Sequence, residues 1–198
     1  MPNNVWELPP VVDTGDSPNR RAEELATIVP KDRRKPYNMR KLLELVVDKD
    51  SVFEIQPTYC KAVITSLARI NGKVVGIIAN NPMIYGGALD LKSSRKQTHF
   101  IQLCDTFHVP LIFLVDVPGF MVGKDAELAG TLREGMRSVY VAMQATVPIL
   151  TVVLATRGAT SAGSSMPRRP SCAPDLARRC AWACCPEAAG EWTRSPAP

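Results

Sequence analysis

Two kinds of hydrophobic pattern alternate along the chain, and together they predict an α/β fold. Continuous apolar runs, typical of strands buried on both faces, are separated by segments whose apolar residues recur every three or four positions, as in helices. This alternation favours a largely parallel sheet with right-handed crossovers. We expect strands at residues 52–55, 62–70, 73–79, 111–115 and 149–154, and helices at 39–48, 93–107 and 126–145, with a shorter helix within 20–29.

Two local signals support these elements. Asn38 stands where the first long helix would need its N-cap. Asn71-Gly72 supplies the two positive-φ residues of a type I′ turn, so the strands on either side should form a hairpin. The second arm of that hairpin, Val74–Ile78, is almost wholly apolar, which predicts a central position in the sheet.

The segment Leu111–Phe120 is the best candidate for a functional site. Its apolar half reads as a buried strand, Asp116 closes it, Pro118 fixes the local φ, and Gly119 permits a sharp turn. The carboxyl ends of parallel strands open into the crevice where α/β proteins bind ligands. The pattern therefore predicts a site here, although these residues alone do not name its substrate.

Composition divides the chain into three parts. Residues 1–36 are rich in Pro, Asn, Asp, Arg and Glu, which predicts a linker or N-terminal arm. Residues 37–154 carry the periodic elements and form the main domain. Residues 155–198 contain six prolines and four cysteines without sustained periodicity, so we expect an irregular tail that is disordered or that comes from a shifted reading frame.

Charge and cysteine usage exclude several function classes. The formal net charge is +5, but +3 of it falls from residue 155 onward, and the remainder lacks the aromatic-basic pattern of a nucleic-acid surface. No apolar run is long enough to span a membrane, and no secretory signal pattern begins the chain. We therefore expect a cytoplasmic protein in which Cys60 and Cys104 are buried, reduced thiols.

Metal and hydrolase chemistry are also disfavoured. The tail cysteines, Cys172, Cys180, Cys184 and Cys185, lack the paired spacing of a zinc site, so we expect no metal. The histidines, His99 and His108, have no recognisable serine or cysteine partner and are expected to be structural or surface residues. No Gly-x-Ser-x-Gly occurs, which disfavours a Ser-His-Asp hydrolase.

Seven segments match a known family in register: Ile28–Arg40, Phe53–Pro57, Ile70–Met83, Gly87–Asp90, Cys104–Pro110, Val115–Phe120 and Arg133–Gly135. They resemble the C-terminal half of the carboxyltransferase (β) subunit of biotin-dependent acyl-CoA carboxylases. This group includes propionyl-CoA, methylcrotonyl-CoA and acetyl-CoA carboxyltransferases and related decarboxylase subunits. The resemblance covers roughly residues 22–154 and implies a crotonase-like ββα superhelix that forms an incomplete C-terminal carboxyltransferase domain.

The resemblance implies transfer of a carboxyl group from carboxybiotin to the α-carbon of an acyl-CoA. In such subunits the N-terminal half holds acyl-CoA, the C-terminal half holds carboxybiotin, and the site forms between halves of two subunits. This chain begins at the linker, so we expect the acyl-CoA half to be absent and the chain to be inactive alone. Its expected partners are a biotin carboxylase or biotin carrier subunit, an acyl-CoA half and further copies of the subunit. The alternative is a non-catalytic fragment that binds such partners.

The resemblance also assigns roles to two loops. Gly86, Gly87 and Ala88 would be catalytic, because backbone amides in a glycine turn can donate hydrogen bonds to an oxyanion. The alternative for this pair of glycines is a turn that merely needs positive φ. By analogy with crotonase folds, the loop would form one side of the oxyanion hole in the biotin half.

The second loop would bind biotin through Asp116, Pro118, Gly119 and Phe120, with Phe120 as an apolar wall. The alternative here is a stiff corner in which Asp116 bonds nearby amides. In the helix that follows, Gly135 should permit close packing, since glycine otherwise costs helix stability. The family's Arg-Lys-x-Tyr-Gly-Gly-like stretch after the last strand has no match in residues 155–163.

Overall fold

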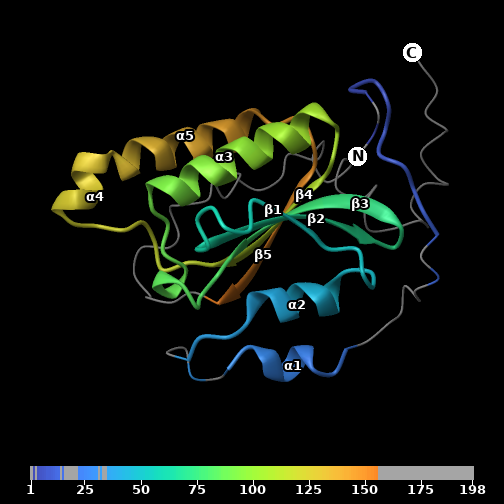
Figure 1. The fold of residues 1–198 in the computed structure, drawn as a ribbon, viewed down its shortest axis with the longest axis horizontal. Helices are drawn as coiled ribbons and strands as arrows, with labels where there is room; N and C mark the ends of the chain where they lie inside the picture. The colour runs from blue at the N-terminus through green and yellow to red at the C-terminus, as the bar shows by residue number, and fades with distance from the viewer. Residues whose placement is uncertain are drawn as a thin grey trace, which may run out of the picture.

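Five strands form one sheet between two layers of helices in the computed structural model (Figure 1). The structure describes residues 2, 4–13, 15, 22–30, 32 and 35–155. Helices α3 and α5 cover one face of the sheet, and α1 and α2 cover the other. The elements are α1 (Leu25–Ile28), α2 (Met39–Val46), β1 (Phe53–Ile55), β2 (Val63–Ile70), β3 (Lys73–Asn80), η1 (Tyr85–Gly87), α3 (Leu91–Thr106), β4 (Leu111–Asp116), α4 (Lys124–Ala129), α5 (Thr131–Gln144) and β5 (Ile149–Ala155).

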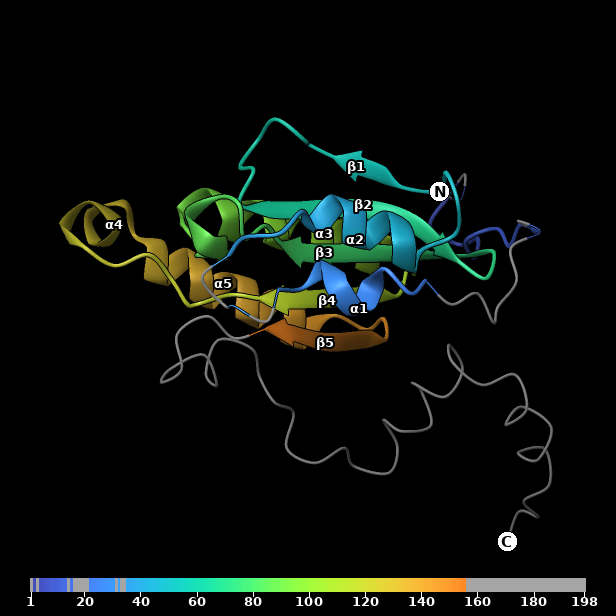
Figure 2. The ribbon, with the colours of Figure 1, turned by 90° about the horizontal axis from the view of Figure 1, so that it is seen from below.

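The sheet is mixed, and its strands lie in chain order from β1 to β5 (Figure 2). β1 pairs with β2, and β2 with β3, in antiparallel fashion, whereas β3, β4 and β5 are parallel. The antiparallel β2–β3 pair is the hairpin that Asn71-Gly72 predicted. The sheet as a whole is nevertheless only half parallel, so the expectation of a largely parallel sheet is wrong. The physical reason is that residues 56–62 between β1 and β2 are too few for the crossover that a parallel pair needs.

The hairpin between β2 and β3 confirms the expected turn. Asn71 and Gly72 have φ values of 50° and 74°, as a type I′ turn requires. The carboxylate of Asp48 accepts the N–H of Asn71 at 3.0 Å and that of Gly72 at 2.8 Å. From the sequence we expected this helix to extend to Asp48. Helix α2 instead ends at Val46, and Asp48 binds the turn.

The core lies on both sides of the sheet because successive strand residues point to opposite faces. Phe113 and Val115 of β4 face α3 and α5, while Leu114 between them packs against the layer that contains α2. β3 is the middle strand, as its apolar sequence predicted. Asn38 caps α2 through the N–H groups of Arg40 and Lys41, also as predicted.

The long helix predicted at residues 126–145 is two helices. Gly130, in the left-handed conformation with φ 81°, ends α4 and begins α5. Glycine adopts this conformation without a Cβ penalty, and it commonly ends helices for that reason. α4 buries no residue and extends beyond the end of the sheet (Figure 2).

The two flanking parts of the chain are described only in portions. In the N-terminal arm, α1 packs on α2 through Leu25 and Ile28, and the N–H of Val12 donates to the carbonyl of Gly72 at 3.0 Å. Residues 156–198 lie outside the described residues, and so do the predictions about the tail and its cysteines. Within the described residues, none of the helices has the length and apolar character needed to cross a membrane.

Candidate functional site at the carboxyl ends of β3 and β4

The two loops singled out from the sequence lie side by side. The N–H of Leu89 donates to the carbonyl of Gly119 at 3.0 Å, and the N–H of Met121 donates to the carbonyl of Leu89 at 2.9 Å. These bonds form an isolated parallel bridge between Leu89 and Phe120, beyond the ends of β3 and β4. The loop after β3 and the corner after β4 are therefore joined through their backbones.

The glycine turn contains three successive residues with positive φ. Tyr85, Gly86 and Gly87 have φ values of 50°, 61° and 85°. A Cβ at Gly87 would lie 2.5 Å from the carbonyl oxygen of Asp116, so only glycine lets this turn approach the end of β4 so closely. The tight turn is thus a requirement for joining the two loops.

Of the three residues predicted to be catalytic, Gly86, Gly87 and Ala88, two have amides that already have acceptors. The N–H of Gly87 donates to the carbonyl of Ile84 at 2.9 Å, and that of Ala88 donates to the carbonyl of Tyr85 at 3.1 Å. The N–H of Gly86 has no acceptor among the described residues. Among residues 86–88, the N–H of Gly86 is therefore the one without an acceptor in this conformation.

The corner after β4 combines a buried acid with an open glycine. Asp116 is fully buried, and Pro118, Gly119 and Phe120 then bring the chain to the surface. No atom lies within 4 Å of the position where a Cβ would stand at Gly119, and the same holds at Gly86. The backbone of each loop therefore faces open space that a ligand could enter.

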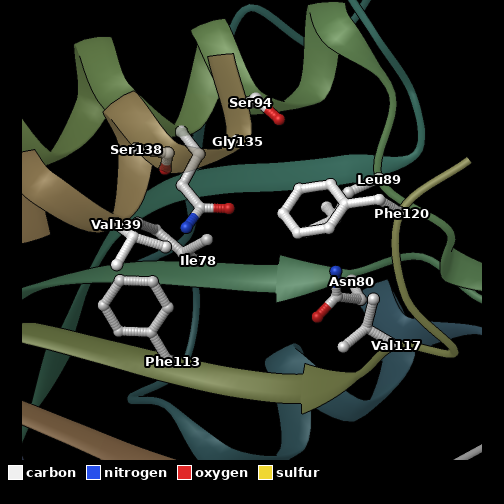
Figure 3. Close-up of a pocket in the computed structure, with 11 residues that line it drawn as sticks. Ile78, Asn80, Leu89, Ser94, Phe113, Val117, Phe120, Gly135, Ser138 and Val139 are labelled. Atoms are coloured by element: carbon white, nitrogen blue, oxygen red, sulfur yellow. The ribbon is translucent and has the colours of Figure 1, made fainter. Parts of the chain in front are cut away.

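Phe120 forms one wall of a pocket between the helices and the sheet (Figure 3). Leu89 and Phe113 supply further apolar surface, and Asn80 and Ser138 supply polar atoms. The hydroxyl of Ser138 is buried and has no hydrogen-bond partner among the described residues. The pocket has apolar walls with a few polar groups, and in this conformation it has room for about one water molecule.

The cysteine thiols of the described domain are not activated nucleophiles. Burial, followed by the carboxylate of Asp90, raises the pKa of the Cys60 thiol. Burial raises the pKa of the Cys104 thiol to about 12. Both thiols are therefore protonated at neutral pH. Cys104 is buried as expected, but Cys60 is only half-buried because it lies in the loop before β2 rather than inside a strand.

Other residues considered from the sequence lie apart from the pocket. His99 and His108 are exposed, as is Arg133. No cluster of three or more His, Cys, Asp or Glu side chains that could hold a metal ion occurs within the described ranges. The groups that the site itself offers are backbone amides and polar side chains.

Sequence reasoning missed several residues that shape the site. Asn81 anchors the start of the glycine loop, because its N–H donates to the carbonyl of Ala62 at 2.8 Å and its side-chain amide donates to the carbonyl of Lys61 at 2.9 Å. Gln97 and Ser138 line the pocket from α3 and α5. Their positions in the sequence could have indicated them. Asn81 directly follows the central strand, and Gln97 shares the helical face of Phe100.

Comparison with known proteins decides the family. The family model for the carboxyl transferase domain matches residues 1–175. The chain belongs to the carboxyl transferase family. Over 153 residues, or 77% of its length, this carboxyl transferase chain is 42% identical to methylmalonyl-CoA decarboxylase subunit alpha of Veillonella parvula and covers 30% of that protein. It is also 42% identical over 153 residues to the mitochondrial propionyl-CoA carboxylase beta chain of Homo sapiens and covers 28% of it.

Solved structures agree with this assignment. The carboxyl transferase chain matches transcarboxylase 12S, which was solved as a hexamer assembly with methylmalonyl-coenzyme A bound, with a TM-score of 0.74 and 38% identity. The match covers 77% of this chain and 29% of that one. The fold is therefore crotonase-like, as the resemblance implied. The chain spans less than a third of each of these relatives.

Proposed function

We propose that this chain forms the carboxybiotin-handling half of a biotin-dependent acyl-CoA carboxyltransferase, which moves a carboxyl group from carboxybiotin to the α-carbon of an acyl-CoA. One observation carries the proposal. Two glycine-containing loops of a carboxyl transferase domain are joined by the bridge between Leu89 and Phe120, each loop has open space at a glycine, and both bridge residues line an apolar pocket. Family membership supports this class of chemistry, and the full length of the relatives supports a partner for the chain.

The ureido ring of the cofactor would lie against the two loops. The open space beside Gly86 and Gly119 permits close approach to the backbone, and Phe120 and Leu89 offer apolar contact for the ring. Carboxybiotin, when bound, supplies the carboxyl group and leaves negative charge on its ureido oxygen.

The role of the chain is to stabilise that charge. We assign the Gly86–Ala88 turn as the oxyanion-binding element, with the N–H of Gly86 as its free donor. A well-placed donor of this kind is worth roughly 3 kcal/mol of transition-state stabilisation. Pro118 restricts the corner so that Gly119 and Phe120 stay in place. Because both loops continue ordered strands, the donor needs little reorganisation when charge develops.

The proposed partner surface is an exposed apolar stripe on α4 and α5. Its residues are all exposed: Leu128 on α4, and Leu132, Met136, Tyr140 and Met143, which follow one another at helical spacing on α5. The relatives are more than three times as long as the matched segment, so a substantial part of each has no counterpart here. We propose that the acyl-CoA half packs on this stripe, next to the pocket that Gly135 lines from the same helix.

A reconstituted carboxylation assay tests the function. The purified chain is mixed with the acyl-CoA half of a relative and a carboxybiotinylated carrier protein, and carboxyl incorporation into acyl-CoA is measured. We expect transfer that needs all three components and that falls about tenfold or more in Phe120→Ala, by loss of positioning. Lys92→Met, at an exposed position of α3, serves as the matched control and should leave transfer unchanged.

Association is measured separately from turnover. Leu132→Glu combined with Met136→Glu should abolish binding of the acyl-CoA half, because it places charges in an apolar contact. Tight binding without any transfer would instead favour the alternative, a non-catalytic module that binds the partner subunits of a carboxylase.

A further inference from the structure

A buried lysine holds the segment on which the glycine loop rests. Lys96, on α3, has only 2% of its surface exposed. Its Nζ donates to the carbonyl of Val63 at 2.8 Å and to that of Cys60 at 3.4 Å. Burial of an ammonium group is costly unless hydrogen bonds compensate it, and here burial lowers the pKa of Lys96. A methionine could fill the same space without that cost. The two hydrogen bonds of the ammonium group are therefore what distinguishes lysine from an apolar residue at this position.

The segment that Lys96 binds also holds the start of the glycine loop. Asn81, the first residue after β3, donates its backbone N–H to Ala62 and its side-chain amide to Lys61. It also accepts the N–H of Met83 at 3.2 Å through its side-chain oxygen. Residues 60–62 therefore fix the path by which the chain leaves the sheet.

The same segment holds the end of the glycine loop. The thiol of Cys60 donates to Oδ1 of Asp90, with 3.5 Å between sulfur and oxygen. That oxygen also accepts the N–H of Ser93 at 2.7 Å in the capping box of α3. Asp90 directly follows Leu89, the residue that bonds both to Gly119 and to Met121. Displacement of Cys60 would therefore be passed on to the bridge between the two loops.

We infer that Lys96 is a positioning residue for carboxyl transfer, which through residues 60–62 holds both ends of the loop that carries Gly86. Lys96 does not reach the pocket itself, and its effect passes through backbone carbonyls. The inference rests on the proposed function. Three N–H donors on one ammonium group can serve two carbonyls at once, which neither an apolar side chain nor a single amide N–H can do.

Amide hydrogen exchange in the full 198-residue chain tests the contact directly. In Lys96→Met we expect the amides of Gly87 and Ala88 to exchange about tenfold faster, because the turn that they close opens more often. Ile101→Val, at a fully buried position of the same helix, is the matched control for general loss of stability. It should raise exchange in the loop and in β4 by the same factor.

A milder variant keeps the test valid if Lys96→Met does not fold. Cys60→Ala removes only the thiol contact to Asp90 and should give the same selective increase, to a smaller degree. If Lys96→Met or Cys60→Ala raises the amide exchange rates at Gly87 and Ala88 by no more than it raises those in β4, the inference is overturned.

Kinetics separate positioning from mere stability. In the reconstituted assay, Lys96→Met should lower kcat about tenfold and leave the KM for acyl-CoA unchanged, because the acyl-CoA site lies elsewhere. Faster loop exchange with an unchanged kcat would overturn the inference. Absence of transfer by the unaltered chain would count against the proposed function, and the exchange experiment would then decide the loop contact on its own.

Discussion

The ring of Phe120 lies directly on the backbone of Gly135, where a Cβ would stand 2.5 Å from Cε1 and 2.7 Å from Cζ. Alanine normally stabilises a helix interior by about 1 kcal/mol relative to glycine. Here we expect Gly135→Ala to lower the free energy of unfolding by about 1 to 3 kcal/mol, because the methyl group displaces the ring. Urea denaturation measures the change, and carboxyl transfer should fall with it.

Removal of the ring provides the control for this contact. With Phe120→Ala as background, Gly135→Ala should become neutral or stabilising, since nothing opposes the new methyl group. A stabilising effect of Gly135→Ala in the unaltered chain would show that the ring does not press on the helix.

The two glycines of the turn should differ in their response to alanine. Gly86→Ala adds a methyl group to open space and should cost about 1 to 2 kcal/mol, from the positive φ alone. Gly87→Ala meets the carbonyl of Asp116 as well and should cost clearly more. Thermal denaturation of both variants measures the difference. Equal losses would mean that the turn does not press on β4.

Cys104 should make stability depend on alkaline pH. Its folded pKa of about 12 lies above the reference value of 9.0. The thiol therefore favours the folded state at neutral pH, and this contribution is lost as pH rises from 9 through 12. Between pH 8 and pH 10 the unaltered chain should lose about 1.4 kcal/mol relative to Cys104→Ala. Parallel pH curves for the two proteins would contradict this.

Asp48 should contribute more to stability than an exposed acid. Asp48→Ala leaves the N–H groups of Asn71 and Gly72 without their carboxylate, and such a loss typically costs about 1.5 to 3 kcal/mol. Glu44→Ala, at an exposed position of α2, is the control and should change stability by no more than about 0.5 kcal/mol. Chemical denaturation of both variants decides the matter.

Local rules were sufficient where neighbouring residues decide the conformation. The Asn38 cap and the Asn71-Gly72 turn depend on side-chain and backbone preferences within a few positions, and the structure contains both. The apolar run of β3 likewise predicted its central place. The adjacency of the two site loops followed from a general rule, because the carboxyl ends of neighbouring parallel strands lie at the same edge of a sheet.

Features that depend on distant partners could not be predicted in this way. Nothing near Asp48 indicates that its carboxylate meets a turn formed much later in the chain. The burial of Lys96 depends on carbonyls that β2 brings to α3, although its place on the helical face of Phe100 was visible. The break at Gly130 was missed because a single glycine is tolerated within many helices, and only its left-handed backbone shows that the helix ends there.

The mixed sheet has a consequence for how the chain acquires its fold. β1, β2 and β3 are neighbours both in sequence and in space, so they can associate at a small entropic cost of loop closure. β4 and β5 are each preceded by a helical connection, so each can pair with the sheet only after that longer segment has folded back. We therefore expect β1, β2 and β3 to form first as a template, and the candidate site at the ends of β3 and β4 to be complete only after β4 has joined.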